Sequence, residues 1–218
     1  RRNSLVMTEP PKTLTAELLP LLRIKGFAKA EHLAEALGRD ADELAAALAA
    51  LVETGDASSS ALGHKLTPEG AAKADAQLAA ERESADPAQV DALHERFGPV
   101  NRAFKTLMND WQVKTVDGQQ VPNDHADEAY DRAVLDRLER VHDDLAGILA
   151  GLVAEAPRFE RYPERFDRAL QRVRQGEHRY LGAPLIDSYH TVWFELHEDL
   201  IRLAGRNRAD EAAAGRAV

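Results

Sequence analysis

The stretch of sequence with the most chemically active side chains is IDSYHTVWFELHEDLI, at positions 186–201. On a helix, steps of three or four residues place Asp187, His190 and His197 on one face. The two imidazoles are then two turns apart, about 10 Å along the axis, which is too far for easy chelation of one metal ion. Asp187 and His190 could share a metal with the Asn, Asp and His side chains of residues 123–127, because such groups are ordinary metal ligands.

The rest of the sequence argues against a metal, a cofactor or catalysis. It contains no HExxH pair, EF-hand loop, GxGxxG or P-loop sequence, and no nucleophile elbow. It also has no cysteine, which excludes disulfides, thiolate zinc sites and a cysteine nucleophile. The simpler interpretation of His190 and His197 is that they are partly buried helix or interface residues. We therefore predict a protein that is not an enzyme and that binds no metal or cofactor.

An organic ligand fits these side chains better than a metal does. Both tryptophans and all four tyrosines lie beyond residue 110, and aromatic walls with a few polar groups are typical of small-molecule sites. The candidate ligand-binding residues are Trp111, Tyr130, Tyr189, His190, Trp193 and His197. The alternative is that aromatic residues at helical spacing fill a hydrophobic core.

Arginine is concentrated at positions 158–179, where seven arginines stand against four acidic residues. Such a segment could hold an anionic ligand or an acidic partner. Its arginines are also three or four positions from carboxylates, as in the ion pairs of a solvated helix. We interpret the segment as a solvated helix face.

The elements that must position these residues are mostly helices. Apolar spacing and capping residues predict helices at 14–25, 28–37, 40–54, from 67 onward, 87–113 and 127–155. After a turn between Pro157 and Pro163, a helix runs to about residue 175, and a last helix covers 186–204. Two short strands at 57–60 and 63–66 form a tight hairpin, while TVDGQQVPNDHAD reads as a loop. The predicted fold is mainly α: an N-terminal winged helix-turn-helix domain at 8–84, an all-helical bundle at 85–206, and a polar tail at 207–218.

The segment LLRIKGFAKAEHLAEALGRDADELAAALAALVETGDA, with GHKLTPEGAAK after it, resembles the winged-helix domain of MarR-type bacterial transcriptional regulators over about residues 14–83. The helices beyond it resemble a domain found behind winged helices in actinobacterial-looking regulators, on the motifs DWQ, NDH…AYD…VL and DSYHTVWFELHEDL. The resemblance implies a DNA-binding homodimer whose helical domain dimerises and senses a small-molecule effector. The DNA contacts would come from Lys25, Lys29, Arg39, His64 and Lys65.

The charge of the chain opposes that implication. Residues 40–54, the expected recognition helix, contain no Lys, Arg, Asn or Gln, the residue types that most often read bases. Residues 11–85 hold eight basic and twelve acidic side chains, a net charge of −4 within a chain of net charge −9. DNA-binding domains are usually basic. The alternative is therefore a degenerate winged helix that serves as a protein-interaction or accessory module and does not bind DNA.

No apolar run approaches the roughly 20 residues needed to cross a bilayer. The first residues also lack the hydrophobic centre of a signal peptide. We expect a cytoplasmic protein that does not contact a membrane.

Overall fold

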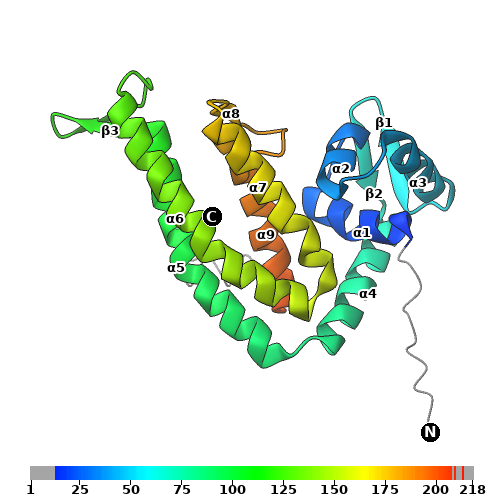
Figure 1. The fold of residues 1–218 in the computed structure, drawn as a ribbon. Coiled ribbons are helices and arrows are strands. Elements are labelled where there is room, and N and C mark those ends of the chain that lie inside the picture. The colour runs from blue at the N-terminus through cyan, green and yellow to red at the C-terminus, as the bar shows by residue number, and fades with distance from the viewer. Residues whose placement is uncertain (1–12, 208, 210–212, 214–218) are drawn as a thin grey trace, which may run out of the picture. The chain divides into compact units, whose positions relative to one another are not determined.

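A computed structural model of the protein describes residues 13–207, 209 and 213 (Figure 1). The described chain is mainly helical, as predicted, with two small antiparallel hairpins. It divides into two compact units, residues 1–75 and 76–218. The predicted polar tail 207–218 lies largely outside the described residues. No helix within the described part is long and apolar enough to span a membrane.

The N-terminal unit consists of three helices followed by a hairpin. Its elements are α1 (Leu14–Lys25), α2 (Ala30–Leu37), α3 (Ala41–Glu53), β1 (Ala57–Ser60), β2 (Gly63–Leu66) and the first turns of α4 (Pro68–Ser84). Both strands have the bounds expected from the sequence. Leucines of α1, α2 and α3 form the core, with Leu18, Leu33 and Leu44 all fully buried.

The start and end of α3 follow from local chemistry. The carboxylate of Asp40 accepts hydrogen bonds from the backbone N–H groups of Asp42 and Glu43, at 2.8 and 3.4 Å, and so caps the helix as predicted. Three leucines and one valine are interspersed with alanines, which have the highest helix propensity. The first helix is different, because Thr13 rather than Thr15 precedes it and the Thr13 side chain makes no capping bond.

The LTPEG segment, which begins with the last residue of β2, connects the hairpin to the end of α3 through hydrogen bonds. The Thr67 hydroxyl donates to the carbonyl of Gly55 at 2.7 Å and accepts from the N–H of Gly70 at 3.1 Å. A Cβ atom at position 70 would lie 1.9 Å from the carbonyl oxygen of Asp56, so only glycine fits there. Lys73 then pairs with Asp56 at 2.7 Å. The hydrogen bonds from Lys73 and Thr54 hold the pKa of Asp56 below its usual value.

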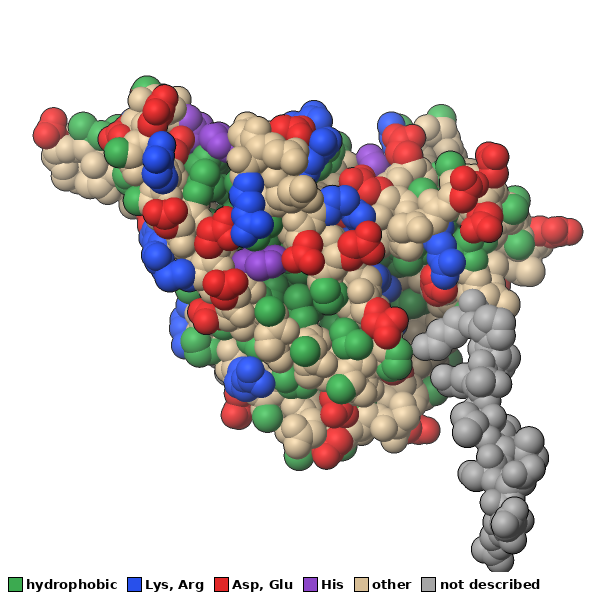
Figure 2. Space-filling view, viewed as in Figure 1, with side chains coloured by type: hydrophobic (Ala, Val, Ile, Leu, Met, Phe, Trp, Pro, Cys, Tyr) green, Lys and Arg blue, Asp and Glu red, His purple; other side chains and the backbone are tan. Residues whose placement is uncertain are grey.

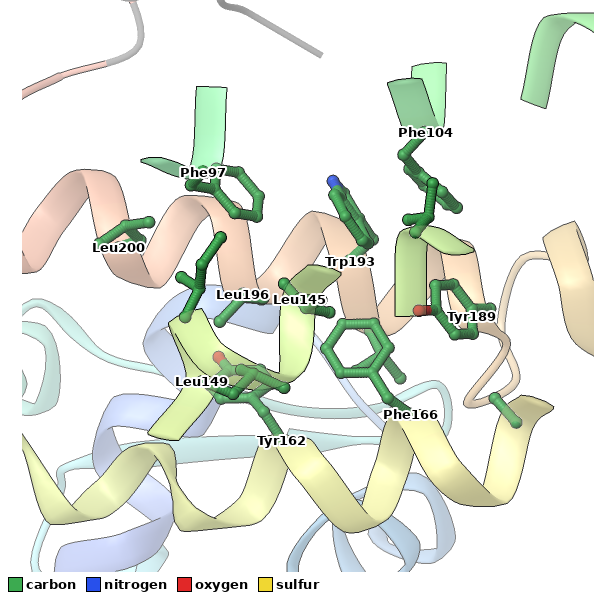
Figure 3. Packing of buried hydrophobic residues seen from close by; sticks show 14 of the residues in the cluster. Phe97, Phe104, Leu145, Leu149, Tyr162, Phe166, Tyr189, Trp193, Leu196 and Leu200 are labelled. Carbon is green, nitrogen blue, oxygen red and sulfur yellow. The ribbon is translucent and has the colours of Figure 1, made fainter. Parts of the chain in front are cut away.

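The C-terminal unit is built from long helices. Its elements after α4 are α5 (Pro87–Gln112), β3 (Val113–Val116), β4 (Gln119–Pro122), α6 (Glu128–Glu155), the 3-10 turn η1 (Pro157–Glu160), α7 (Arg161–Arg174), α8 (Arg179–Gly182) and α9 (Tyr189–Leu203). Helices α5 and α6 run alongside each other in Figure 1. The core between α5, α6, α7 and α9 is rich in aromatic residues (Figure 3).

Helix α5 runs through Gly98 and Pro99 in one span, as predicted, but two other details of this unit differ from the prediction. The segment 113–122, expected to be a loop, is a hairpin whose turn is Asp117–Gly118, with both residues at positive φ (50° and 81°). The last helix begins at Tyr189 and not at 186, because Ser188 adopts an extended backbone and caps it.

Candidate functional sites

The exposed face of α3 is small, apolar and acidic. Its solvent-exposed residues are Ala41, Asp42, Glu43, Ala45, Ala46, Ala49, Ala50, Val52 and Glu53. These side chains offer three carboxylates and no base-reading amide or cation. The space-filling view shows acidic side chains spread over the visible face of the N-terminal unit (Figure 2). This surface lacks the chemistry that direct readout of a DNA groove requires.

The five residues predicted to contact DNA do not form one free cationic strip. Arg39 donates to the carboxylate of Glu17 at 2.8 Å, and the ammonium of Lys29 lies 3.9 Å from a carboxylate oxygen of Glu31. Lys25 is half-buried at the end of α1. The two hairpin residues differ: Lys65 is exposed, whereas His64 is half-buried and its backbone bridges to Ala28. Carboxylates thus already engage two of the predicted phosphate contacts.

The hairpin carries apolar side chains in solvent. Leu62, in the turn between β1 and β2, is 72% exposed, and Phe27, just after α1, is 45% exposed. The Phe27 ring lies over the hairpin, because its Cζ atom is 2.9 Å from the position that a Cβ atom would occupy if residue 63 were not glycine. An apolar residue at a hairpin tip cannot pair with phosphate, but it is suited to contact with another protein.

Four of the six predicted ligand-binding residues lie along α9, and the structure places three of them in the core. Tyr189 and Trp193 are fully buried, and His197 is 2% exposed with its ring 5.2 Å from that of Phe97. The Trp193 indole stacks on Phe104 at 4.1 Å (Figure 3), and its Nε1–H donates to Asn101 at 2.9 Å. His190 is only half-buried, and this burial lowers its pKa.

The other two predicted ligand residues form a separate group at the end of α5. Trp111 packs against His125 and His178, and the Tyr130 hydroxyl donates to the Asp110 carbonyl at 2.9 Å. A shallow depression of about 420 Å³ lies at the first turns of α6, and none of the six predicted residues lines it. The predicted set is therefore split between two places.

The arginine-rich segment differs most from its interpretation as a solvated face. Arg158, Arg161 and Arg165 are largely buried, whereas Arg172, Arg174 and Arg179 are more exposed, as expected. Arg165 is 1% exposed. It makes a bidentate pair with Asp187 through Nε at 2.8 Å and Nη2 at 2.5 Å, and Nη2 also donates to Glu195 at 2.8 Å.

A second buried cluster lies one turn earlier. Asp199 accepts hydrogen bonds from Arg161 and from the Tyr162 hydroxyl, each at 2.8 Å, and it also pairs with Arg158. Arg158 pairs in addition with Glu81 of α4. Burial raises the pKa of the Tyr162 phenol, so this hydroxyl remains a hydrogen-bond donor. The two clusters fasten α7 to α9 through charge.

The loop before α6 holds a hydrogen-bonded group that the sequence had suggested only as metal ligands. Asn123 donates to the Trp111 carbonyl at 3.1 Å and to Asp131 Oδ1 at 2.8 Å. His125 Nδ1 lies 2.9 Å from Asp131 Oδ2, and the His125 ring packs on the Trp111 indole at 4.4 Å. The motif NDH…AYD is the sequence signal for this group.

A metal shared between Asp187, His190 and the 123–127 loop has no support in this geometry, because Asp187 is bound by Arg165. Within the described residues, no three His, Asp or Glu side chains are arranged to hold a metal ion. Comparisons with protein-family models, with curated proteins and with solved structures gave no match. The resemblance to MarR-type regulators accordingly depends on the sequence motifs alone.

Proposed function

We propose that the N-terminal unit is a winged helix that binds another protein rather than DNA, and that the chain is an interaction or accessory module. The observation that carries this proposal is the exposed face of α3, which presents alanines, Val52 and three carboxylates. In a winged helix this surface would be the one that enters the major groove. Carboxylates there repel phosphate, while an apolar face with an acidic border suits a partner segment that is apolar and basic.

The ion pairs around α3 support the same assignment. A phosphate contact would have to displace Glu17 from Arg39, and Glu31 from the vicinity of Lys29. Each phosphate that a protein neutralises contributes a salt-dependent increment of DNA affinity, and these two cations contribute less of it while carboxylates neutralise them. The exposed Leu62 at the hairpin tip is a further apolar side chain in solvent.

The second candidate is a DNA-binding regulator similar to the MarR type. Three helices followed by a hairpin are the element order of a winged helix, and Lys65 is an exposed cation on that hairpin. In this case the C-terminal unit would be a helical bundle that dimerises and binds a small-molecule effector. A homodimer would double the few phosphate contacts of each copy.

The two candidates are separated by binding of the full chain to DNA from its own promoter, at about 50 mM and 200 mM salt. The interaction module predicts no salt-dependent binding by the natural protein. It also predicts that Asp42→Lys with Glu43→Lys creates weak, salt-sensitive binding, because only the charge of the α3 surface is unsuitable. Salt-sensitive binding by the natural protein that Lys65→Glu weakens, and that Lys105→Glu in the other unit does not, would establish the regulator instead.

A positive test uses a photo-crosslinking residue at position 49, which is on the exposed face of α3, in living cells. The proposal predicts crosslinks to one protein, and a matched probe at the exposed position 133 of α6 should not give them. Crosslinks from position 49 to DNA would contradict it.

A further inference from the structure

The His125 side chain is held in place from several sides. Its Nδ1 atom meets Asp131, its backbone N–H donates to Asn123 Oδ1 at 3.2 Å, and one face of its ring packs on Trp111. The backbone at His125 is left-handed, with φ 56°, a conformation that is uncommon for residues other than glycine. Such backbone strain is concentrated at functional sites and persists where surrounding contacts enforce it.

The chemistry of Asp131 fixes which nitrogen of His125 carries the proton. An ionised carboxylate only accepts hydrogen bonds, so the contact of 2.9 Å requires a proton on Nδ1. In the tautomer that carries its proton on Nδ1, the lone pair is on Nε2. The His125 side chain is 40% exposed, whereas the Asp131 side chain is 8% exposed. The arrangement therefore places a partly exposed imidazole against a buried carboxylate, and Nε2 is the ring nitrogen that this carboxylate does not engage.

We propose that Nε2 of His125 is a nucleophilic site that accepts an acyl group from a small activated carbonyl compound, such as an ester or anhydride. The Nε2 lone pair attacks the carbonyl carbon, the bond from this carbon to the leaving oxygen breaks, and the leaving group departs with the electron pair. The ring becomes an acyl-imidazolium cation, which the Asp131 carboxylate stabilises. The Nδ1 proton then passes to solvent, and water hydrolyses the acyl-imidazole.

This role differs from loop closure alone. Asn123 and Asp127 suffice to close the loop and to start α6, because Asn123 joins it to α5 and Asp127 caps the helix through the N–H groups of residues 129 and 130. A carboxylate that orients an imidazole and stabilises its cation is the arrangement by which histidine acts as a base or nucleophile. The site lies wholly in the C-terminal unit and does not depend on what the N-terminal unit binds.

The protein contains its own reference imidazole. His178 packs on the same indole, with its ring centroid 5.3 Å from that of Trp111, and is exposed. Among the described residues, no carboxylate pairs with the His178 ring. Both histidines are exposed, so exposure alone would give them comparable reactivity. If the buried carboxylate activates the imidazole, His125 would react faster.

The experiment treats the full chain with a small amount of diethyl pyrocarbonate near neutral pH and follows the acyl adducts by peptide mass spectrometry. We expect His125 to react about tenfold faster than His178, because a charge-assisted hydrogen bond strengthens as the ring becomes cationic. Asp131→Asn should remove this advantage, and His125→Gln should remove the adduct from that peptide while leaving the one at His178. Faster reaction at His178 in the natural protein would overturn the proposal without reference to any variant. An unchanged ratio in a folded Asp131→Asn protein would overturn it as well.

Discussion

Replacing the buried Arg165 by methionine should cost a large part of the stability of the C-terminal unit. Arg165 is 1% exposed and donates three hydrogen bonds to the carboxylates of Asp187 and Glu195, which are also buried. Methionine fills similar space but leaves two carboxylates without this cation. Removing one partner of a buried ion pair typically costs about 3–5 kcal/mol, because the remaining charge is poorly solvated. We expect a loss of that size in the free energy of unfolding.

The same reasoning predicts that the loss is recoverable. Neutralising the carboxylates as well, in Arg165→Met with Asp187→Asn and Glu195→Gln, removes the uncompensated charges. Arg168, whose Nη2 lies 3.6 Å from Asp187, is 36% exposed and can turn to solvent. The triple variant should therefore have a free energy of unfolding within about 2 kcal/mol of that of the natural protein, because neutral amides cost much less to bury than unpaired carboxylates.

The assay is urea unfolding of the full chain at neutral pH, followed by far-ultraviolet circular dichroism. Arg174→Met serves as the control, because Arg174 pairs with Glu139 on the surface and should contribute at most about 1 kcal/mol. The reasoning is refuted if Arg165→Met and Arg174→Met lower stability equally. It is also refuted if the triple variant is less stable than Arg165→Met alone.

Three further substitutions test the local chemistry. His190→Gln should flatten the pH dependence of stability, measured in unfolding curves at several pH values. Burial lowers the pKa of His190 below its ordinary 6.5, so the natural protein loses stability as the pH falls below about 6.5. Asp40→Ala should lower the free energy of unfolding by about 1 kcal/mol in urea titrations, by removing the α3 cap, and an unchanged value would contradict the capping bonds. Gly70→Ala should cost about 3 kcal/mol or more, measured in the same way, because its Cβ would meet the Asp56 carbonyl. Gly98→Ala is the control, because a Cβ there would make only an ordinary contact of 3.6 Å with the Arg102 side chain.

Much of the fold was predictable because its signals are local. The strands 57–60 and 63–66 and the Asp40 cap follow from short patterns that act within a few residues. The second hairpin was missed although Asp117–Gly118 is a strong turn signal, since its polar strands lack the apolar alternation expected of a half-buried sheet. The helix predicted at 87–113 is confirmed as one span through Gly98 and Pro99.

The buried arginines could not be predicted from spacing for a physical reason. Arg165 has an acidic residue one position before it and another two after it, which looks like a solvated helix. Its actual partners, Asp187 and Glu195, are 22 and 30 residues away and reach it only after α9 packs on α7. His125 was considered only as a metal ligand, because its pairing with Asp131 requires the loop to fold back over the start of α6.

Net charge alone is therefore a poor guide to what this protein binds, because its carboxylates serve different purposes in the two units. In the C-terminal unit, Asp187, Glu195 and Asp199 are buried and compensated by arginine, so they contribute little to the field that an approaching macromolecule meets. On α3, Asp42 and Glu43 are exposed, and in a winged helix they would lie where a duplex has to dock. A neutral or even basic chain with these two side chains would meet the same local repulsion, which is why the DNA-binding test depends on α3 and not on the overall charge of −9.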